Sequence, residues 1–192
     1  MKVPKWFFDA VTNYRANRIA GYLSEQMMPG ETVLDCGCGS MFIADLLQQR
    51  HGLIAFGADV IQLNQRNHQF CMCSAEKLAF RDESFDNACL IFALHHMSDP
   101  LAAIQECLRV TKKRLIVLED VYENIFELQM LKFFDHHGNR IISEDMHLPF
   151  NFKTETEWKT TFENLAVKVM AVERIRPNQW RPTRHRMFVL EK

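Results

Sequence analysis

The sequence lacks several features that would decide its class at once. It has no excess of either charge, since the net charge is −1 over 192 residues, which excludes a global attraction to nucleic acid or to an anionic membrane. No apolar run is long enough to span a bilayer, and the first residues contain no secretory apolar stretch. Repeats, linkers and low-complexity segments are also missing. We therefore expect one globular domain in the cytoplasm, with no membrane partner.

The cysteines lack the spacing of a zinc site. Cys36/Cys38 and Cys71/Cys73 are C-x-C pairs, whereas structural zinc sites use C-x-x-C pairs or cysteine with histidine. Both pairs fall in strand-like segments, which indicates small core residues and free thiols in a reducing compartment. The cysteines therefore predict no metal.

The stretch 33–40 organises the chain. An apolar pair leads to Asp35, then to Gly37 and Gly39, and an amphipathic segment begins near Phe42. This pattern predicts a buried strand, a tight turn and the start of a helix, and the glycines allow a ligand to approach the backbone. Asp35 repels phosphate but suits an ammonium, a sulfonium or sugar hydroxyls. The dinucleotide fingerprint needs a third glycine where Phe42 stands, so a nucleotide-linked oxidoreductase is disfavoured.

A second acid follows one strand later. The apolar segment 53–60 predicts a strand that ends near Asp59. An acid at the tip of the second strand of a βαβ unit lies beside the ligand crevice, where it accepts hydrogen bonds from a ribose diol. The order of glycine loop, helix, strand and acid favours this role over an exposed turn aspartate.

The rest of the chain continues the alternation of strands and helices. Strands are predicted at 32–36, 53–60, 69–73, 85–92, 113–120, 167–175 and 184–190. Helices are predicted at 6–28, 41–50, from Pro100 after an Asp99 cap, at 122–137 up to a break at Gly138, and after a Thr154–Glu157 capping box. The last two strands are close enough in sequence to pair antiparallel.

Five motifs in this order resemble a class I S-adenosylmethionine-dependent methyltransferase of the small-molecule type. They are the stretches 33–40, 57–59, 75–86, 94–100 and 106–110. The resemblance implies an α/β fold, a Rossmann-like doubly wound sheet of seven strands that is mostly parallel, with an antiparallel last strand and helices on both faces. We expect the single domain 1–192 to consist of an N-terminal helix or lid (1–30), a cofactor-binding core (31–120), a substrate-side cap (121–164) and a closing hairpin (165–192).

The resemblance also implies a cofactor, S-adenosylmethionine, with S-adenosylhomocysteine as the product. By position, the cofactor-binding residues are Asp35, Gly37 and Gly39 at the methionine part, Asp59 at the ribose, Ser74, Ala75 and Glu76 at the adenine, and Phe92 in the pocket wall. The chain departs from the family at Met41, where a third glycine is frequent, and at Ser74, where an acid is frequent. Lys112–Arg114 replaces the usual Pro-Gly-Gly and predicts a different turn. The alternative is therefore a non-catalytic scaffold that binds cofactor or a partner protein.

Histidines supply the candidate catalytic groups. His95 and His96 follow the fourth strand, beside the expected methyl group, and histidine can act as a base near neutral pH. Glu119 and Asp120 are second choices at the same sheet edge. His136 and His137 are interpreted as surface groups at a helix end.

The expected partner is a small-molecule methyl acceptor. It is predicted to lie between the N-terminal helix and the segment 122–152, both of which are rich in aromatic residues, so an apolar or aromatic acceptor is favoured. Tyr14 or Arg15 would reach a ligand carboxylate if the N-terminal helix acted as a lid, whereas plain packing on the sheet is favoured. Nucleic acid is disfavoured as a partner, and the chain is expected to be a monomer or a homodimer.

Overall fold

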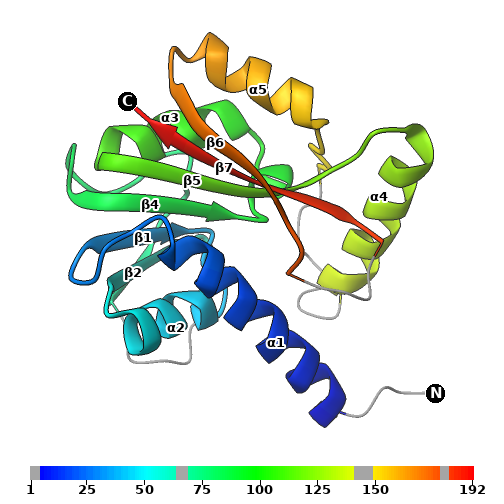
Figure 1. Ribbon diagram of the computed structural model, residues 1–192, viewed down its shortest axis with the longest axis horizontal. Coiled ribbons are helices and arrows are strands. Elements are labelled where there is room, and N and C mark those ends of the chain that lie inside the picture. The colour runs from blue at the N-terminus through cyan, green and yellow to red at the C-terminus, as the bar shows by residue number, and fades with distance from the viewer. Residues whose placement is uncertain (1–4, 64–68, 141–148, 178–181) are drawn as a thin grey trace.

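A single mixed sheet runs through the molecule (Figure 1). The computed structural model describes residues 5–63, 69–140, 149–177 and 182–192. Its strand order is β3-β2-β1-β4-β5-β7-β6. The strands are β1 (Thr32–Cys36), β2 (Ile54–Asp59), β3 (Gln69–Met72), β4 (Phe85–Ile91), β5 (Thr111–Val121), β6 (Lys168–Ile175) and β7 (Arg184–Glu191). The predicted seven-stranded, doubly wound α/β fold is confirmed.

Burial explains why the central strands pair as they do. Four of the five residues of β1 and six of the seven residues of β4 are buried, as expected for strands that are covered on both faces. Leu34 of β1 aligns with Phe56 of β2 on one side and with Ala88 of β4 on the other, all in parallel. The last strand, β7, is antiparallel to both β5 and β6, which confirms the predicted insertion of the closing strand.

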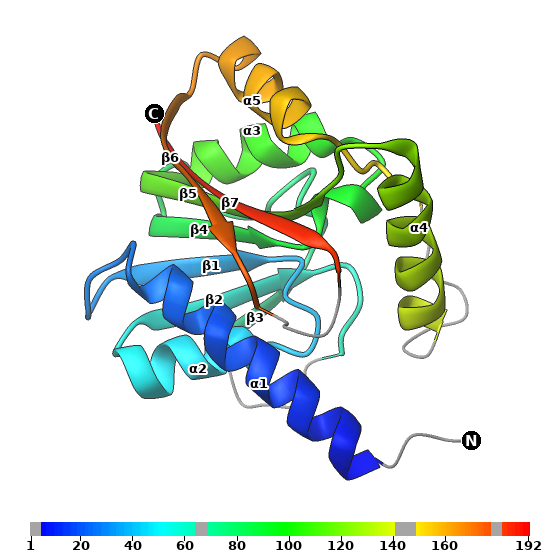
Figure 2. The ribbon, with the colours of Figure 1, turned by 45° about the vertical axis from the view of Figure 1, so that its right-hand side comes forward.

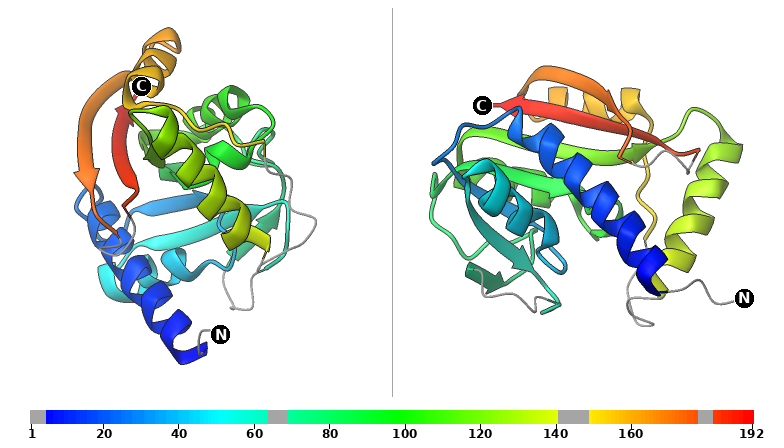
Figure 3. Two further views of the ribbon diagram at one scale, coloured as in Figure 1. Left: turned by 90° about the vertical axis from the view of Figure 1, so that its right-hand side faces the viewer. Right: turned by 60° about the horizontal axis from the view of Figure 1, so that its bottom comes forward.

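Helices cover the two faces of the sheet (Figures 2 and 3). The helices α1 (Lys5–Ser24) and α2 (Phe42–His51) lie on one face, and α3 (Pro100–Val110) and α5 (Glu155–Asn164) lie on the other. A separate hydrophobic cluster fills each side, with Trp158 and Phe162 fully buried under α5 and with Leu23 and Leu47 under α1 and α2. The predicted Asp99 cap of α3 and the Thr154–Glu157 capping box of α5 are both confirmed.

The helix α4 (Ile125–Arg140) stands in front of the carboxyl ends of the parallel strands (Figure 3, left). It passes through Gly138, so the predicted break there is wrong. Its apolar residues are not all covered either, because Leu131 is buried whereas Phe126 and Phe133 are exposed. None of the described helices is long and apolar enough to cross a membrane.

Two other predicted boundaries are wrong. The first helix ends at Ser24, several residues before the proline and glycine expected to end it. Residues 112–114 form no turn, because β5 begins at Thr111 directly after α3. Within the predicted cap, residues 141–148 lie outside the described residues.

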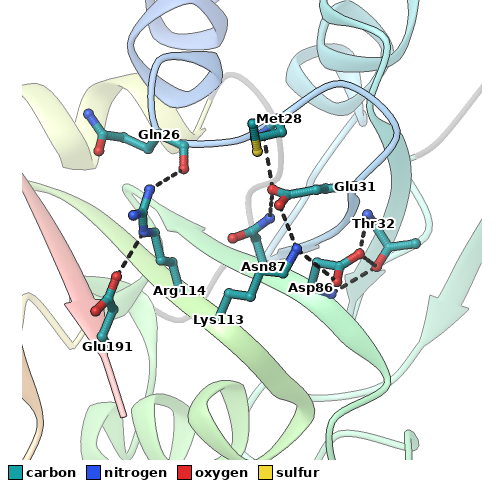
Figure 4. A network of polar contacts seen from close by, with 9 residues as sticks. All are labelled: Gln26, Met28, Glu31, Thr32, Asp86, Asn87, Lys113, Arg114 and Glu191. Atoms are coloured by element: carbon teal, nitrogen blue, oxygen red, sulfur yellow. Dashed lines mark hydrogen bonds and ion pairs between the residues drawn. The ribbon is translucent and has the colours of Figure 1, made fainter.

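A network of charged groups closes the amino edge of the sheet (Figure 4). The Glu31 carboxylate accepts hydrogen bonds from Met28 N (3.0 Å), Asn87 Nδ2 (2.8 Å) and Lys113 Nζ (2.6 Å). Asp86 Oδ2 accepts from the backbone nitrogen and the hydroxyl of Thr32. These bonds tie β1, β4 and β5 together at the end opposite to α4.

Candidate functional site

The candidate cofactor site lies where the strand order reverses. β2 and β3 follow β1 on one side, and β4 follows it on the other, so the connections leave a crevice at the carboxyl ends of β1 and β4. Ligands of open α/β sheets bind at such a switch point. The predicted cofactor residues lie near the carboxyl ends of β1 and β2 or in the segments that follow β1, β3 and β4.

The bend after β1 has the left-handed backbone that its glycines predict. Gly37 has a φ of 77° and Gly39 a φ of 50°. A Cβ at Gly37 would lie 2.9 Å from the Cβ of Ala93, whereas a Cβ at Gly39 would meet no atom within 4 Å. The structure therefore needs Gly37 for packing, and it leaves open space beside Gly39.

Met41 occupies the core and not the open side of the bend. It has a φ of 58° and is fully buried in the cluster beneath α1 and α2. Its Sδ and Cε lie against the backbone of Gly57 on β2, where an added Cβ would be only 2.7 Å away. The departure from the third glycine of the family therefore places no side chain beside Gly39.

Two carboxylates meet at this bend. Asp59 accepts a hydrogen bond from Gly39 N at 2.8 Å with one oxygen and from Ile61 N at 3.0 Å with the other. Asp35 is only 3% exposed, and its Oδ1 has no hydrogen-bond partner among the residues that the structure describes. Burial, followed by the negative charge of Asp59, raises the pKa of Asp35 to about 7. A buried oxygen without a hydrogen bond costs folding free energy, so Oδ1 is a candidate acceptor for a hydrogen-bond donor of a ligand.

The side chains of two residues that are predicted to contact adenine make hydrogen bonds within the protein. Ser74 Oγ accepts from Glu76 N at 3.1 Å, and Glu76 Oε1 accepts from the backbone nitrogens of Ser98 and Asp99 ahead of α3. Ala75 is buried in the core on the α3 side. The side chains of Ser74 and Glu76 thus shape the loop, and a role beside adenine stays a prediction.

Phe92 follows β4 in a strained conformation. Its φ is 51°, in the left-handed region that non-glycine residues seldom adopt, and its backbone nitrogen donates to Leu118 O at 2.8 Å. The guanidinium of Arg15 lies 4.5 Å from the ring centroid, and the His185 ring meets its edge at 5.4 Å. The helix α1 therefore reaches the crevice through Arg15, one of the two residues considered for a lid.

The candidate catalytic histidines lie at the same edge, in a short 3-10 helix from Leu94 to His96. Nδ1 of His95 is 2.7 Å from Glu119 Oε2, and the other oxygen of Glu119 accepts from Leu94 N at 2.8 Å. The His95 ring stacks on Phe152 with centroids 4.5 Å apart. His95 is therefore buried and held from two sides.

Asp135 of α4 joins the two histidines. Its Oδ1 is 3.5 Å from Nε2 of His95 and 3.5 Å from Nε2 of His96. Burial alone would lower the pKa of His95, but Glu119 and Asp135 outweigh it and raise that pKa to about 10. Burial and the charge on His95 lower the pKa of His96 to about 4, against the opposite effect of Asp135 and Asp120.

A second acid–histidine pair lies next to this cluster. Asp120 Oδ1 is 2.5 Å from Nδ1 of His185 on β7. Burial opposes ionisation of Asp120, but the His185 contact prevails and lowers its pKa. Both acids named as second choices, Glu119 and Asp120, are thus paired with histidines. His136 and His137 lie farther along α4, where His137 is exposed and bonds to Phe133 O.

Comparison with known proteins finds a family match over part of the chain. Residues 34–117 match the family model described as a methyltransferase domain. This part of the chain is similar to a methyltransferase domain.

The relatives of the chain include two enzymes of quinone biosynthesis. The ubiquinone/menaquinone biosynthesis C-methyltransferase of Xanthomonas campestris is 30% identical over 138 residues, which cover 61% of this chain and 52% of that protein. The ubiquinone biosynthesis O-methyltransferase of Pseudomonas fluorescens is 33% identical over 97 residues, which cover 44% of this chain and 41% of that protein. The chain thus spans about half the length of the curated relatives it matches.

A solved structure shares the fold over nearly the whole chain. A chain of the complex between the Haloferax volcanii Trm112 methyltransferase activator and the putative methyltransferase aligns with a TM-score of 0.74 at 16% identity. The alignment covers 98% of this chain and 95% of that one. This likeness shows the fold alone.

The sequence interpretation missed Asp135 and Phe152. Asp135 is one of several polar residues in the predicted helix 122–137, among them Lys132 and His136, so no local signal distinguishes it. Nothing in the local sequence of Phe152 indicates that its ring stacks on His95.

Proposed function

We propose that the domain transfers a methyl group from S-adenosylmethionine to a small acceptor of apolar or aromatic character. The observation that carries the proposal is Asp35 Oδ1, a buried carboxylate oxygen that has no donor among the described residues and lies beside a left-handed bend. A ligand with an ammonium group would supply the missing donor and a compensating charge. The cofactor, when bound, supplies an electrophilic methyl group on a positively charged sulfur.

The residues at the bend suit the parts of that cofactor. We assign Asp35, Gly37 and Gly39 to the methionine part, because the space beside Gly39 is open. We assign Asp59 to the ribose, since its two bonds to backbone nitrogens leave lone pairs for hydroxyl donors. Phe92 would form a wall of the pocket. Contacts to adenine would come from Ala75 and the backbone of 74–76, because the side chains of Ser74 and Glu76 are engaged elsewhere.

The acceptor would bind at the histidine cluster. The ring centroids of His95 and Phe152 stack 4.5 Å apart, and those of Phe152 and Phe150 stack 6.4 Å apart. Flat aromatic surfaces therefore line the cluster. The side chain of His96 is 22% exposed against 3% for His95, and we therefore assign contact with the acceptor to His96 and a positioning role to His95. The protein contributes mainly alignment of the acceptor with the methyl group and exclusion of water. The quinone-biosynthesis names of two relatives fit an aromatic acceptor.

The test is calorimetric binding of S-adenosylhomocysteine to the full chain. We expect the wild type to bind and Asp35→Asn to bind about 10- to 100-fold more weakly, because a charge-assisted hydrogen bond is lost. Asp86→Asn, the same change at the opposite edge of the sheet, serves as the matched control and should bind like the wild type. A folded wild-type protein that binds no S-adenosylhomocysteine would contradict the proposal and favour the non-catalytic scaffold.

A further inference from the structure

His95, His96 and Asp135 converge at the carboxyl end of β4. One ligand atom from each of the three residues can be chosen so that all lie within 4.8 Å of one another. Asp135 Oδ1 is 3.5 Å from Nε2 of each histidine. The residues come from two elements, the 3-10 helix after β4 and the helix α4, which stands in front of the sheet edge (Figure 3, left).

We propose that these three residues bind one divalent transition-metal ion of the zinc class. Two imidazoles with one carboxylate are a donor set that suits zinc, iron or nickel better than magnesium or calcium. Tetrahedral bonds of zinc to nitrogen and oxygen place neighbouring ligand atoms about 3.3–3.5 Å apart. The distances from Asp135 Oδ1 to the two Nε2 atoms match that spacing.

The surroundings of His95 resemble the second layer of a metal site. Metal-binding histidines commonly donate their other ring nitrogen to a carboxylate, which fixes the ring and its tautomer. Glu119 Oε2 lies 2.7 Å from Nδ1 of His95, and this leaves Nε2 directed at Asp135. Glu119 is itself held by Leu94 N, and Phe152 fixes the plane of the His95 ring by stacking. This support is independent of the spacing of the three ligands.

The charge of the region also favours a cation. Three carboxylates, those of Glu119, Asp120 and Asp135, surround the two imidazoles, and Glu119 is fully buried. The guanidinium of Arg15 and the imidazoles of His95 and His185 face Asp120. With the ligand imidazoles neutral, as metal binding requires, a divalent ion would balance the excess of carboxylates over Arg15 at the point where Asp135 meets both histidines.

Three protein ligands leave a fourth position for another ligand, as in catalytic zinc sites. His96 is the most exposed of the three, so this position faces the side assigned to the acceptor. Metal binding does not depend on the proposed function, whereas its use in methyl transfer rests on it. An acceptor hydroxyl bound to the ion would release its proton to water more readily; its oxygen would then form the bond to the methyl carbon, while the carbon–sulfur electron pair returns to sulfur. The cysteine pairs predicted no metal, and this site uses none of them.

The experiment measures metal binding to the full chain without cofactor. Metal-free protein is titrated with Co²⁺, whose visible absorption reports a tetrahedral site, and then with Zn²⁺ by calorimetry. We expect one ion per chain, displacement of Co²⁺ by Zn²⁺, and binding weakened at least 100-fold in His96→Ala and in Asp135→Asn. Glu119→Gln keeps all three ligands and should weaken binding by about 10- to 100-fold.

The matched control is His137→Ala, an exposed histidine two residues after Asp135 on the same helix. It should bind the metal like the wild type. Absence of metal binding in the wild type, unchanged binding in His96→Ala and Asp135→Asn, or loss of binding in His137→Ala would overturn the proposal. Asp35→Asn separates the two proposals, because it should lose S-adenosylhomocysteine and keep the metal. Circular dichroism verifies that each variant is folded.

Discussion

The two edges of the sheet use acids in opposite ways. At the amino edge, burial alone would raise the pKa of Glu31, but bonds from Lys113, Met28 N and Asn87 prevail and lower it. At the carboxyl edge, Asp35 has no such donor for Oδ1, and its pKa rises to about 7. The carboxylate of Glu31 therefore stabilises the fold at the amino edge, whereas burial of the Asp35 carboxylate at the carboxyl edge costs folding free energy. A carboxylate kept at such a cost is the pattern expected of a binding site.

The largest expected effect concerns the affinity for S-adenosylhomocysteine as a function of pH. If ligand binding needs the ionised form of Asp35, affinity should be nearly constant above pH 7 and fall about tenfold per pH unit below it, about 100-fold between pH 8 and pH 5. Asp59 is the charged group that faces Asp35. Calorimetry across this range provides the measurement, and Asp35→Asn should show weak binding with a flat profile. An equally steep profile in Asp35→Asn would assign the titration to another group.

The stability of the ligand-free protein should respond to Asp35 in the opposite direction. The folded-state pKa of this acid is raised, so its charge destabilises the fold above pH 7, and the penalty declines as the pH falls toward the ordinary value. We expect Asp35→Asn to raise the free energy of unfolding at pH 8 by about 1–3 kcal/mol, after the cost of burying an amide. Urea denaturation at pH 8 and pH 5 tests this, and the gain should shrink at pH 5. A destabilised variant at pH 8 would show that Asp35 is a structural residue.

Glu31→Gln should have the smallest effect, with the reverse sign. Loss of the ion pair to Lys113 should lower the free energy of unfolding by about 1 kcal/mol at pH 7. Because the pKa of Glu31 is lowered in the fold, this contribution is present above its ordinary value and disappears as the pH falls through the folded-state value. Urea denaturation provides the measurement. Affinity for S-adenosylhomocysteine should not change, and a loss of affinity would break the division between the two edges.

The fold could be predicted because its signals are local. Each strand of the core reads as a short apolar run, and the caps at Asp99 and Thr154 mark helix starts within three residues. The errors arose where tertiary packing overrides a local signal. Gly138 costs a helix only about 1 kcal/mol, so α4 continues through it. Lys112 and Lys113 are polar, yet they belong to β5 because the residues on either side of them, Thr111 and Arg114, pair with β4.

The candidate site was predictable only in part. Its cofactor half follows from strand ends, which parallel sheets bring to one edge, so Asp35 and Asp59 could be placed from spacing alone. The histidine cluster depends on Asp135, which lies forty residues after His95 and reaches it through the orientation of α4. No periodicity in the sequence encodes that angle. The metal site proposed above contains no cysteine, so the spacing of the cysteines could not indicate it.

Met41 and Gly57 illustrate a constraint that acts on two positions at once. The thioether fits into the notch that the missing Cβ of Gly57 leaves on β2. A larger residue at 57 would need a shorter one at 41, and a glycine at 41 would leave the notch empty. Variants of this chain should therefore replace the two residues together, because a single replacement at either position would disturb the packing between them.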